Sequence, residues 1–283
     1  MAAYPLPSKE WQEIWWAKVK EVIDRHSPDV LWFDNRMQIL SEGIRQEMAA
    51  YFLNHAIANG QEPVLNYKRP DMVFGAGTID LERSRMPDIF PEPWLTDTSV
   101  SRGSWAYATD LEYYTADRLI DDLVDIVSKN GCMLLNVAPR PDGSIPAEQQ
   151  QILRGIGAWL RVNGEAIYGS RPWLIFGEGP NNPAAGHLAD VGFDGFDGRD
   201  IRFTTNEGKL YAIALGWPVD GHKVTIQALG ASKYADDIRS IQLLGYEGEI
   251  SWERTIDGLV VEMPDVDRGA AAYTFRIERE SMF

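Results

Sequence analysis

Cysteine is almost absent from this chain, which has a single one among 283 residues. One cysteine excludes an intrachain disulfide and any zinc cluster built from several thiolates. Cys132 lies in the apolar run Cys132-Met133-Leu134-Leu135, and we expect its side chain to be buried, as free cysteines usually are. The four histidines are scattered, and none is four residues from another, as helical metal ligands are. We therefore expect no bound metal.

Basic residues are also in short supply. The 27 Lys and Arg stand against 42 Asp and Glu, and the formal net charge is −15. This charge repels nucleic-acid phosphates and anionic membranes, and no basic stripe offsets it. The sequence lacks a phosphate-binding glycine loop, a dinucleotide fingerprint and a Gly-x-Ser-x-Gly elbow. We therefore expect no nucleic-acid partner, no membrane partner and no cofactor. A neutral substrate fits the charge.

Long apolar runs are missing as well. None approaches the roughly 20 residues that a membrane-spanning helix needs. The first residues, Met1 to Pro5, lack the basic start and the apolar segment of a signal peptide. The localisation is therefore unknown from the sequence. The chain is cytoplasmic if it is complete, whereas a truncated chain would have lost any leader.

The first 172 residues alternate helical and strand patterns. Apolar residues recur at helical spacing in four segments, with short strand-like runs between them. The expected helices cover 8–26, 42–59, 115–129 and 146–163, and the expected strands cover 30–33, 63–67, 78–81, 94–98 and 132–137. Because the run at 30–33 is wholly apolar, we expect a strand that is buried on both faces. The alternation favours a parallel sheet or barrel. A complete (β/α)8 barrel has eight strands, and we count at most five, so we expect a partial barrel.

Helical periodicity disappears after Pro172. Short alternating segments separated by Gly and Asp turns take over, which is typical of an antiparallel sandwich. The expected strands of this part are 201–203, 210–215, 224–228, 241–244, 259–262 and 273–277. The sequence thus predicts an α/β fold with two domains, a partial (β/α)8 (TIM-type) barrel over 1–172 and an antiparallel β-sandwich over 173–283.

Two acidic residues are candidates for chemistry. Asp34 directly follows the apolar run at 30–33, at the strand end where barrels carry their active sites. A carboxylate there can attack a sugar carbon or stabilise an oxocarbenium ion, but it can equally be a helix N-cap or a turn residue. Glu82 can supply the second carboxylate that a glycosidase needs, or it can form a solvated salt bridge with its basic neighbours.

Three other side chains are candidates for contacts with a sugar. Lys68 follows a strand pattern and can hold a hydroxyl or orient a carboxylate, although a surface position explains it equally well. Trp94 and Trp105 can stack on a sugar face, but core packing is the commoner use of tryptophan. Spacing alone selects none of these residues.

Several motifs follow one another in order over residues 4–173. The first is Pro28-Asp29-Val30-Leu31-Trp32-Phe33-Asp34, and the others lie at 123–131, 134–137, 141–146, 159–160, 162–169 and 171–173. Together they resemble the α-L-fucosidases of glycoside hydrolase family twenty-nine, and the first motif resembles the nucleophile strand of that family.

The resemblance implies a retaining, exo-acting α-L-fucosidase that removes terminal α-L-fucose from glycans or glycoconjugates by double displacement. By position, Asp34 is the nucleophile and Glu82 the acid/base residue. The implied substrate-binding residues are Trp32, Lys68 and Trp105. Two departures stand out: Lys68 occupies a position where the family often has arginine, and Leu95 occupies one where many relatives have glutamate.

The implied mechanism makes geometric demands. The two carboxyl groups should lie about 5–5.5 Å apart across one sugar-sized gap. Glu82 must hold a proton, so we expect a drier site for it than for Asp34. The expected partner is a fucosylated glycan or glycoside, and a homo-oligomer is left open. The alternatives are a truncated, catalytically inactive fragment and a carbohydrate-binding protein whose sandwich holds the sugar.

Overall fold

The structure, a computed structural model, describes residues 6–184, 186, 188, 193–219, 221–234, 237–266, 268–269 and 271–280. Met1 to Pro5, which the signal-peptide argument concerns, lie outside these residues. Within the described part, no helix is both long and apolar enough to cross a membrane. The chain divides into two compact units, one of residues 1–81 with 92–95 and the other of residues 82–91 with 96–283.

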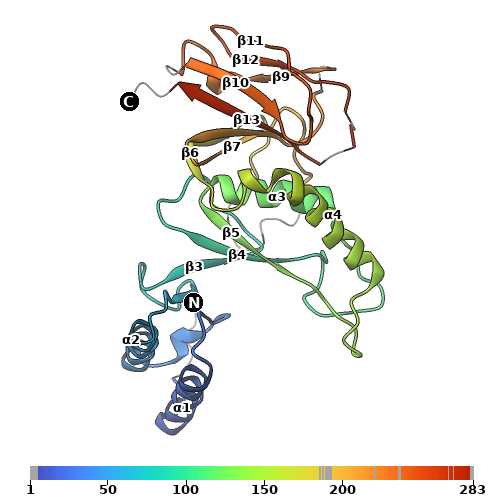
Figure 1. Cartoon of the computed structure of the whole chain (residues 1–283). Coiled ribbons are helices and arrows are strands. Elements are labelled where there is room, and N and C mark those ends of the chain that lie inside the picture. Colours follow the sequence, from blue (N-terminus) through green and yellow to red (C-terminus); the bar gives the residue numbers. More distant parts are fainter. Residues whose placement is uncertain are drawn as a thin grey trace. The chain divides into compact units, whose positions relative to one another are not determined.

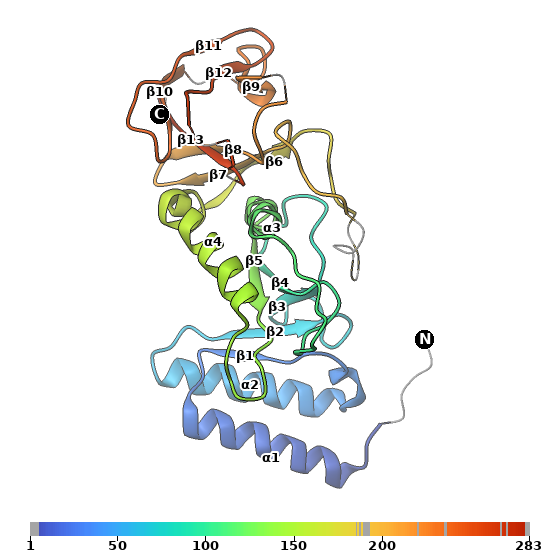
Figure 2. The ribbon, with the colours of Figure 1, turned by 90° about the vertical axis from the view of Figure 1, so that its right-hand side faces the viewer.

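The first unit alternates helices and strands as the sequence predicts. Ser8 caps the first helix because its hydroxyl accepts a hydrogen bond from the Trp11 amide. The first two helices lie alongside each other in Figure 2. The elements are α1 (Lys9–His26), β1 (Val30–Trp32), η1 (Met37–Ile39), α2 (Glu42–Ala58), β2 (Val64–Lys68) and β3 (Thr78–Glu82), whose last residue belongs to the second unit.

The core of this unit forms where the apolar faces of both helices meet β2. Met48 and Phe52, one turn apart on α2, are fully buried, as their spacing predicts. They form one cluster with Ile23 of α1 and Leu65 of β2. The cluster holds α1 and α2 against the strands.

The second unit contains the remaining helices and strands. Thr115 caps α3 by accepting a hydrogen bond from the Arg118 amide. Its helices, and the strands up to residue 136, are α3 (Ala116–Ser128), α4 (Ala147–Asn163), η2 (Gly164–Ala166), β4 (Trp94–Ser99, whose first two residues belong to the first unit) and β5 (Gly131–Asn136). The later elements are β6 (Arg171–Glu178), β7 (Ile201–Asn206), β8 (Lys209–Ala214), β9 (Lys223–Ile226), η3 (Gln227–Leu229), β10 (Asp237–Leu243), β11 (Trp252–Arg254), β12 (Leu259–Glu262) and β13 (Tyr273–Glu280).

Five strands form one sheet in the order β1-β2-β3-β4-β5. The printed registers of β1 with β2 and of β2 with β3 are parallel. Helix α2 connects β1 to β2 and helix α3 connects β4 to β5, as in a partial (β/α)8 barrel, whereas no helix of the described chain separates β2, β3 and β4. The expected architecture of the first part of the chain is confirmed.

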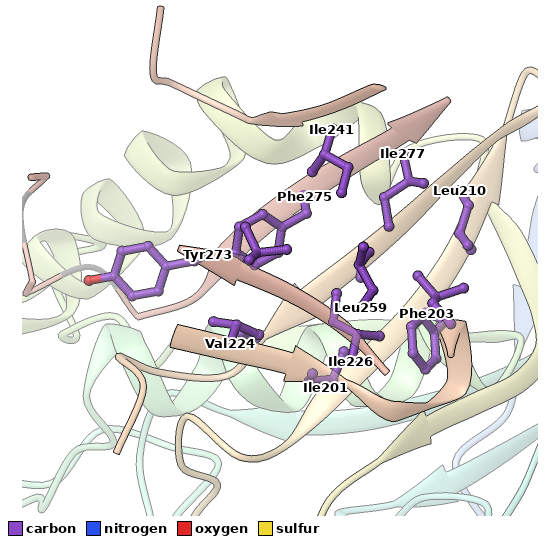
Figure 3. Packing of buried hydrophobic residues seen from close by; sticks show 14 of the residues in the cluster. Ile201, Phe203, Leu210, Val224, Ile226, Ile241, Leu259, Tyr273, Phe275 and Ile277 are labelled. Atoms are coloured by element: carbon purple, nitrogen blue, oxygen red, sulfur yellow. The ribbon is translucent and has the colours of Figure 1, made fainter. Parts of the chain in front are cut away.

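The later strands form a β-sandwich, as predicted. Its sheets have the orders β10-β13-β8-β7-β6 and β11-β12-β9, and their printed pairings are antiparallel. Alternate residues such as Phe203, Ile226 and Phe275 point between the sheets (Figure 3). The sequence reading missed β6 and β11. Strand β6 carries Pro172, and proline is tolerated there because β6 lies at the edge of its sheet.

The larger sandwich sheet is also covered on its other face. Tyr211 and Ile213 of β8 pack with Leu119 of α3 and Trp159 of α4 in a second cluster. Figure 1 shows α3 and α4 (green) against this side of β6 and β7. The indole Nε1 of Trp159 donates to the Ala272 carbonyl at 3.0 Å. These helices thus pack against the sandwich, and α3 also packs against the barrel strand β5.

Two burial expectations were wrong. Strand β1 was expected to be buried on both faces, but Val30 is 54% exposed and Trp32 is 37% exposed. Cys132 was expected to be buried and is exposed. It shares the exposed face of β5 with Leu134, which is 47% exposed. An apolar run shows that both faces of a strand are apolar, but it does not show that a layer covers both faces.

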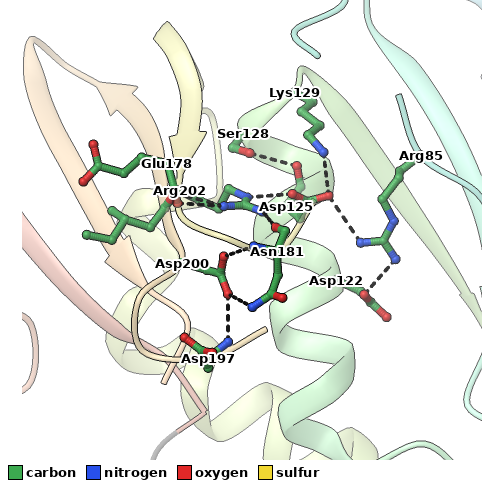
Figure 4. Close-up of polar contacts among 11 residues, drawn as sticks. Arg85, Asp122, Asp125, Ser128, Lys129, Glu178, Asn181, Asp197, Asp200 and Arg202 are labelled. Carbon is green, nitrogen blue, oxygen red and sulfur yellow. Dashed lines mark hydrogen bonds and ion pairs between the residues drawn. The ribbon is translucent and has the colours of Figure 1, made fainter. Parts of the chain in front are cut away.

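A buried ion cluster joins α3 to the sandwich (Figure 4). The carboxylate of Asp125 accepts from Arg202 Nε at 2.6 Å, Lys129 Nζ at 2.9 Å and Arg85 Nη1 at 3.3 Å. All four side chains are at most 2% exposed. Burial by itself would raise the pKa of Asp125, but the three cations outweigh it and hold the pKa below its ordinary value.

Asp121, one turn earlier on α3, is in the opposite situation. Its Oδ1 is buried and has no hydrogen-bond partner within the described part of the chain. Burial, and then the neighbouring carboxylates of Asp122 and Asp117, raise the pKa of Asp121 well above its ordinary value. Arg118 and Arg202 oppose this rise without cancelling it. In the folded chain, the ionised form of Asp121 is therefore destabilising.

Replacing Asp125 should destabilise the fold strongly. Asp125→Asn leaves three buried cations without their shared anion, and we expect a loss of about 3–5 kcal/mol at pH 7. Because the folded pKa of Asp125 is depressed, its contribution is present above about pH 4 and is lost as the pH falls through the folded pKa. Urea unfolding of both proteins from pH 7 downwards measures the difference, which should shrink in acid. A constant or absent difference would contradict the role of the cluster.

Replacing Asp121 should change the free energy of unfolding in the opposite direction. Because its folded pKa is raised, stability falls as the pH rises from about 4 through the folded pKa. Asp121→Asn removes this penalty, so we expect a gain on the order of 1 kcal/mol at pH 8 and almost none at pH 4. The same unfolding series tests this, with Asp125→Asn as the matched change on the same helix. A loss at pH 8 comparable to that of Asp125→Asn would show that Asp121 is stabilising when ionised.

Candidate active site

Polar side chains gather at the carboxyl ends of β1 and β2 and beside the middle of the neighbouring strand β3. Trp32 ends β1, Lys68 ends β2, and Asp80 pairs with Lys68 across the β2–β3 register. Asp34 follows β1 by two residues. Parallel strands bring their carboxyl ends to one edge of the sheet, and that edge carries the active site in β/α barrels.

Lys68 lies between the two carboxylates of this group. Its Nζ is 3.4 Å from Asp34 Oδ1 and 3.7 Å from Asp80 Oδ2. The indole Nε1 of Trp32 donates to Asp80 Oδ2 at 2.7 Å. The Lys68 ammonium also lies 5.6 Å from the centre of the Trp32 ring, within cation–π range. The four side chains thus form one connected cluster.

Burial separates the roles that these groups can take. The side chain of Asp34 is 64% exposed, whereas those of Lys68 and Asp80 are 8% and 0% exposed. The buried ammonium of Lys68 therefore binds the solvent-accessible carboxylate of Asp34 from the protein interior. Such a carboxylate can approach a substrate carbon, while the buried pair stays inside the protein.

Glu82 and Trp105 belong to the second unit. Glu82 is partly exposed and ends β3. The next residue, Arg83, has a φ of 43°, in the left-handed region that residues with a Cβ rarely adopt. Its amide donates to the Asp97 carbonyl at 2.9 Å, which holds the chain in this conformation directly after Glu82. Strained backbone of this kind is concentrated at functional sites.

The side chain of Arg83 supports Trp105. Its guanidinium is buried and donates to the carbonyls of Ser101 at 3.0 Å and Arg102 at 3.2 Å. It lies 4.5 Å from the centre of the Trp105 ring. The Trp105 carbonyl also accepts a hydrogen bond from Asn136, at the end of β5. Trp105 is 37% exposed and so presents part of its ring to solvent.

The structure brings together three of the five residues to which the resemblance assigns a role, namely Trp32, Asp34 and Lys68. Lys68 is buried, which contradicts the surface alternative. Trp94 is fully buried, so the core alternative holds for it. The expected facing of Asp34 and Glu82 joins one residue from each unit and stays a prediction.

Sequence reasoning missed Asp80 and Arg83. Asp80 carried a weak signal, because a carboxylate flanked by Ile79 and Leu81 inside a buried strand needs a partner. Arg83 carried none, since its left-handed backbone and its packing on Trp105 arise only in the folded chain. No group of three or more His, Cys, Asp or Glu among the described residues is arranged to hold a metal ion.

Comparisons with known proteins agree on one family. A family model described as "Alpha-L-fucosidase" matches residues 3–165, and one described as "Alpha-L-fucosidase C-terminal domain" matches residues 197–278. Tissue alpha-L-fucosidase of Rattus norvegicus is 29% identical over 265 residues, covering 91% of this chain and 52% of the relative. Plasma alpha-L-fucosidase of the same species is 27% identical over 259 residues, covering 86% of this chain and 50% of the relative.

A solved structure agrees with these sequence matches. The crystal structure of Thermotoga maritima alpha-fucosidase in complex with fucose superposes with a TM-score of 0.73 at 25% identity, covering 94% of this chain and 56% of that one. The chain spans about half the length of the curated relatives it matches. More than half of the chain matches the first family model, with the motif strand and the cluster of Asp34, Lys68 and Trp32 inside the matched range. The chain belongs to the α-L-fucosidase family.

Proposed function

We propose that the protein represented by this chain is a retaining, exo-acting α-L-fucosidase that hydrolyses terminal α-L-fucose from glycans or glycoconjugates. The observation that carries the proposal is the exposed carboxylate of Asp34 at a strand end, held by the buried ammonium of Lys68. This arrangement occurs within the range that matches the family. The fucose complex of the Thermotoga maritima relative supports the substrate class.

The proposed reaction has two displacements. In the first, Asp34 attacks the anomeric carbon of the fucosyl group while Glu82 gives its proton to the departing oxygen, forming a fucosyl-enzyme. In the second, Glu82 takes a proton from water, which displaces Asp34 and releases fucose. The configuration at the anomeric carbon is inverted twice and is therefore retained.

The other residues have supporting roles in this proposal. Lys68 orients Asp34, because its ammonium lies 3.4 Å from the carboxylate. Trp32 and Trp105 offer aromatic faces to the sugar, and each is 37% exposed. Arg83 keeps the Trp105 ring in place. The proposed partner is a fucosylated glycan or glycoside, and we propose no cofactor.

We also propose a domain boundary near residue 172, between a catalytic barrel part over 1–172 and a β-sandwich over 173–283. Two observations support it. The two family models match separate ranges, 3–165 and 197–278. The last helix of the alternating pattern, α4, ends at Asn163, and from β6 onwards strands predominate.

Asp34→Asn should abolish turnover of an aryl α-L-fucoside, because the amide cannot form the fucosyl-enzyme. The matched control is Asp29→Asn, which makes the same change at an exposed site before β1 and should keep full activity. Incubation with 2-fluoro-fucosyl fluoride, followed by peptide mass spectrometry, should place the label on Asp34. Sugar binding without turnover in the unmodified protein would favour a carbohydrate-binding role, and a label on another acid would reject Asp34 as nucleophile.

Glu82→Gln should lower the rate according to the leaving group. We expect a loss of about 10²–10⁴-fold on a fucoside with a poorly acidic leaving group, because protonation of the oxygen is lost. The loss in the first displacement should be much smaller for an activated aryl leaving group, which departs without a proton. Steady-state and burst kinetics on both substrates test this, with Glu112→Gln as the exposed control. Equal losses in the rate of the first displacement on both substrates would exclude Glu82 as the general acid.

A further inference from the structure

Asp80 is a buried carboxylate that the proposed reaction does not use. Its side chain is 0% exposed and lies on β3, directly across the register from Lys68. Burying an ionised carboxylate is costly unless partners compensate for the lost water. The burial of Asp80 next to the partner of the candidate nucleophile therefore needs a physical explanation.

Trp32 and Lys68, two of the proposed substrate-site residues, both contact the same oxygen of the Asp80 carboxylate. Trp32 Nε1 donates to Asp80 Oδ2 at 2.7 Å, and Lys68 Nζ lies 3.7 Å from the same oxygen. The hydrogen bond fixes the rotation of an indole that is otherwise 37% exposed. The ion pair anchors a flexible four-carbon side chain whose ammonium also reaches Asp34.

We propose that Asp80 is a positioning residue of the fucosidase reaction, acting through Trp32 and Lys68. It holds the indole as a fixed wall of the sugar site, and it keeps the ammonium shared between two carboxylates. We call the contacts of Asp80 with Trp32 and Lys68 the clamp. The catalytic consequence of the clamp rests on the proposed function, but the clamp itself is a structural property that can be measured without turnover.

The sharing of Lys68 has a chemical consequence. While the Lys68 ammonium also pairs with Asp80, it neutralises only part of the negative charge of Asp34. The Asp34 carboxylate therefore keeps the electron density that it needs for attack. Without the charge of Asp80, the ammonium pairs more strongly with Asp34 and makes it a poorer nucleophile. The effect falls on the chemical step, so it appears in kcat and leaves KM largely unchanged.

The clamp can be tested first in the unaltered protein. The indole N–H of Trp32 should exchange with solvent far more slowly than that of Trp11, although the two side chains are similarly exposed, at 37% and 45%. Two-dimensional ¹H–¹⁵N spectra of ¹⁵N-tryptophan-labelled protein, assigned with Trp32→Phe and Trp11→Phe, measure both rates. Equal exchange rates would overturn the clamp without any need for a variant of Asp80.

The second test replaces the charge. In Asp80→Asn, the Trp32 indole proton should move upfield, because a neutral amide is a weaker acceptor than a carboxylate. Turnover of an aryl α-L-fucoside should lose roughly 10–100-fold in kcat, with KM within about twofold. The matched control is Asp71→Asn, the same change at a buried carboxylate of the same unit that accepts from the Gln38 amide. It should leave the Trp32 resonance and the ratio of kcat to KM unchanged.

A double-mutant comparison separates positioning from general damage. If Asp80 acts on kcat through Lys68, then Lys68→Met and the Lys68→Met/Asp80→Asn double variant should have the same kcat within about twofold. Additive losses would overturn that route. If the unmodified protein turns over no fucoside, the proposed function fails for this chain, and the exchange rates and the indole resonance still decide whether Asp80 holds Trp32.

Discussion

Parallel pairing of β1, β2 and β3 is the constraint on which the candidate site depends. Strands that run in one direction end at one edge, so residues far apart in the sequence meet there. Asp34, Lys68 and Asp80 come from three separate segments, and the register that opposes Lys68 to Asp80 brings them within ion-pair distance. The core of Met48, Phe52 and Leu65 keeps these strands against α1 and α2. The chemistry of the site is therefore a consequence of how the sheet is assembled.

Buried carboxylates serve both units by holding cations in place, and their surroundings decide whether they stabilise. Asp80 holds Lys68 beneath an exposed acid, and Asp125 holds three cations between α3 and the sandwich. Asp121 lies one turn from Asp125, yet it has an unpartnered oxygen within the described residues and a raised pKa. The same residue type on the same helix thus has opposite effects, because a buried charge stabilises only when its partners replace the lost water.

The sandwich shares its packing with the helices that precede it. Strand β8 turns Leu210 and Ala212 inward between the two sheets and Tyr211 and Ile213 outward against α3 and α4. Arg202 of β7 reaches Asp125 in the same direction. The β-sandwich is therefore joined to α3 and α4 by apolar and by ionic contacts. This is a physical reason for the two parts to occur in one chain.

The sequence by itself determined the kind and order of the long helices and of most strands, although not of β6 and β11. Helical spacing in 42–59 and strand alternation after Pro172 report local periodicities, which need no knowledge of distant neighbours. It also determined which acids were candidates, since Asp34 follows a recognisable strand. Only the tertiary structure decided which faces are covered, as the exposure of Val30 and Cys132 shows, because coverage depends on other segments. Tertiary structure also decided that Lys68 is buried and that Asp80 binds it, because an ion pair across a sheet exists only once two separate strands have paired and their residues lie opposite each other.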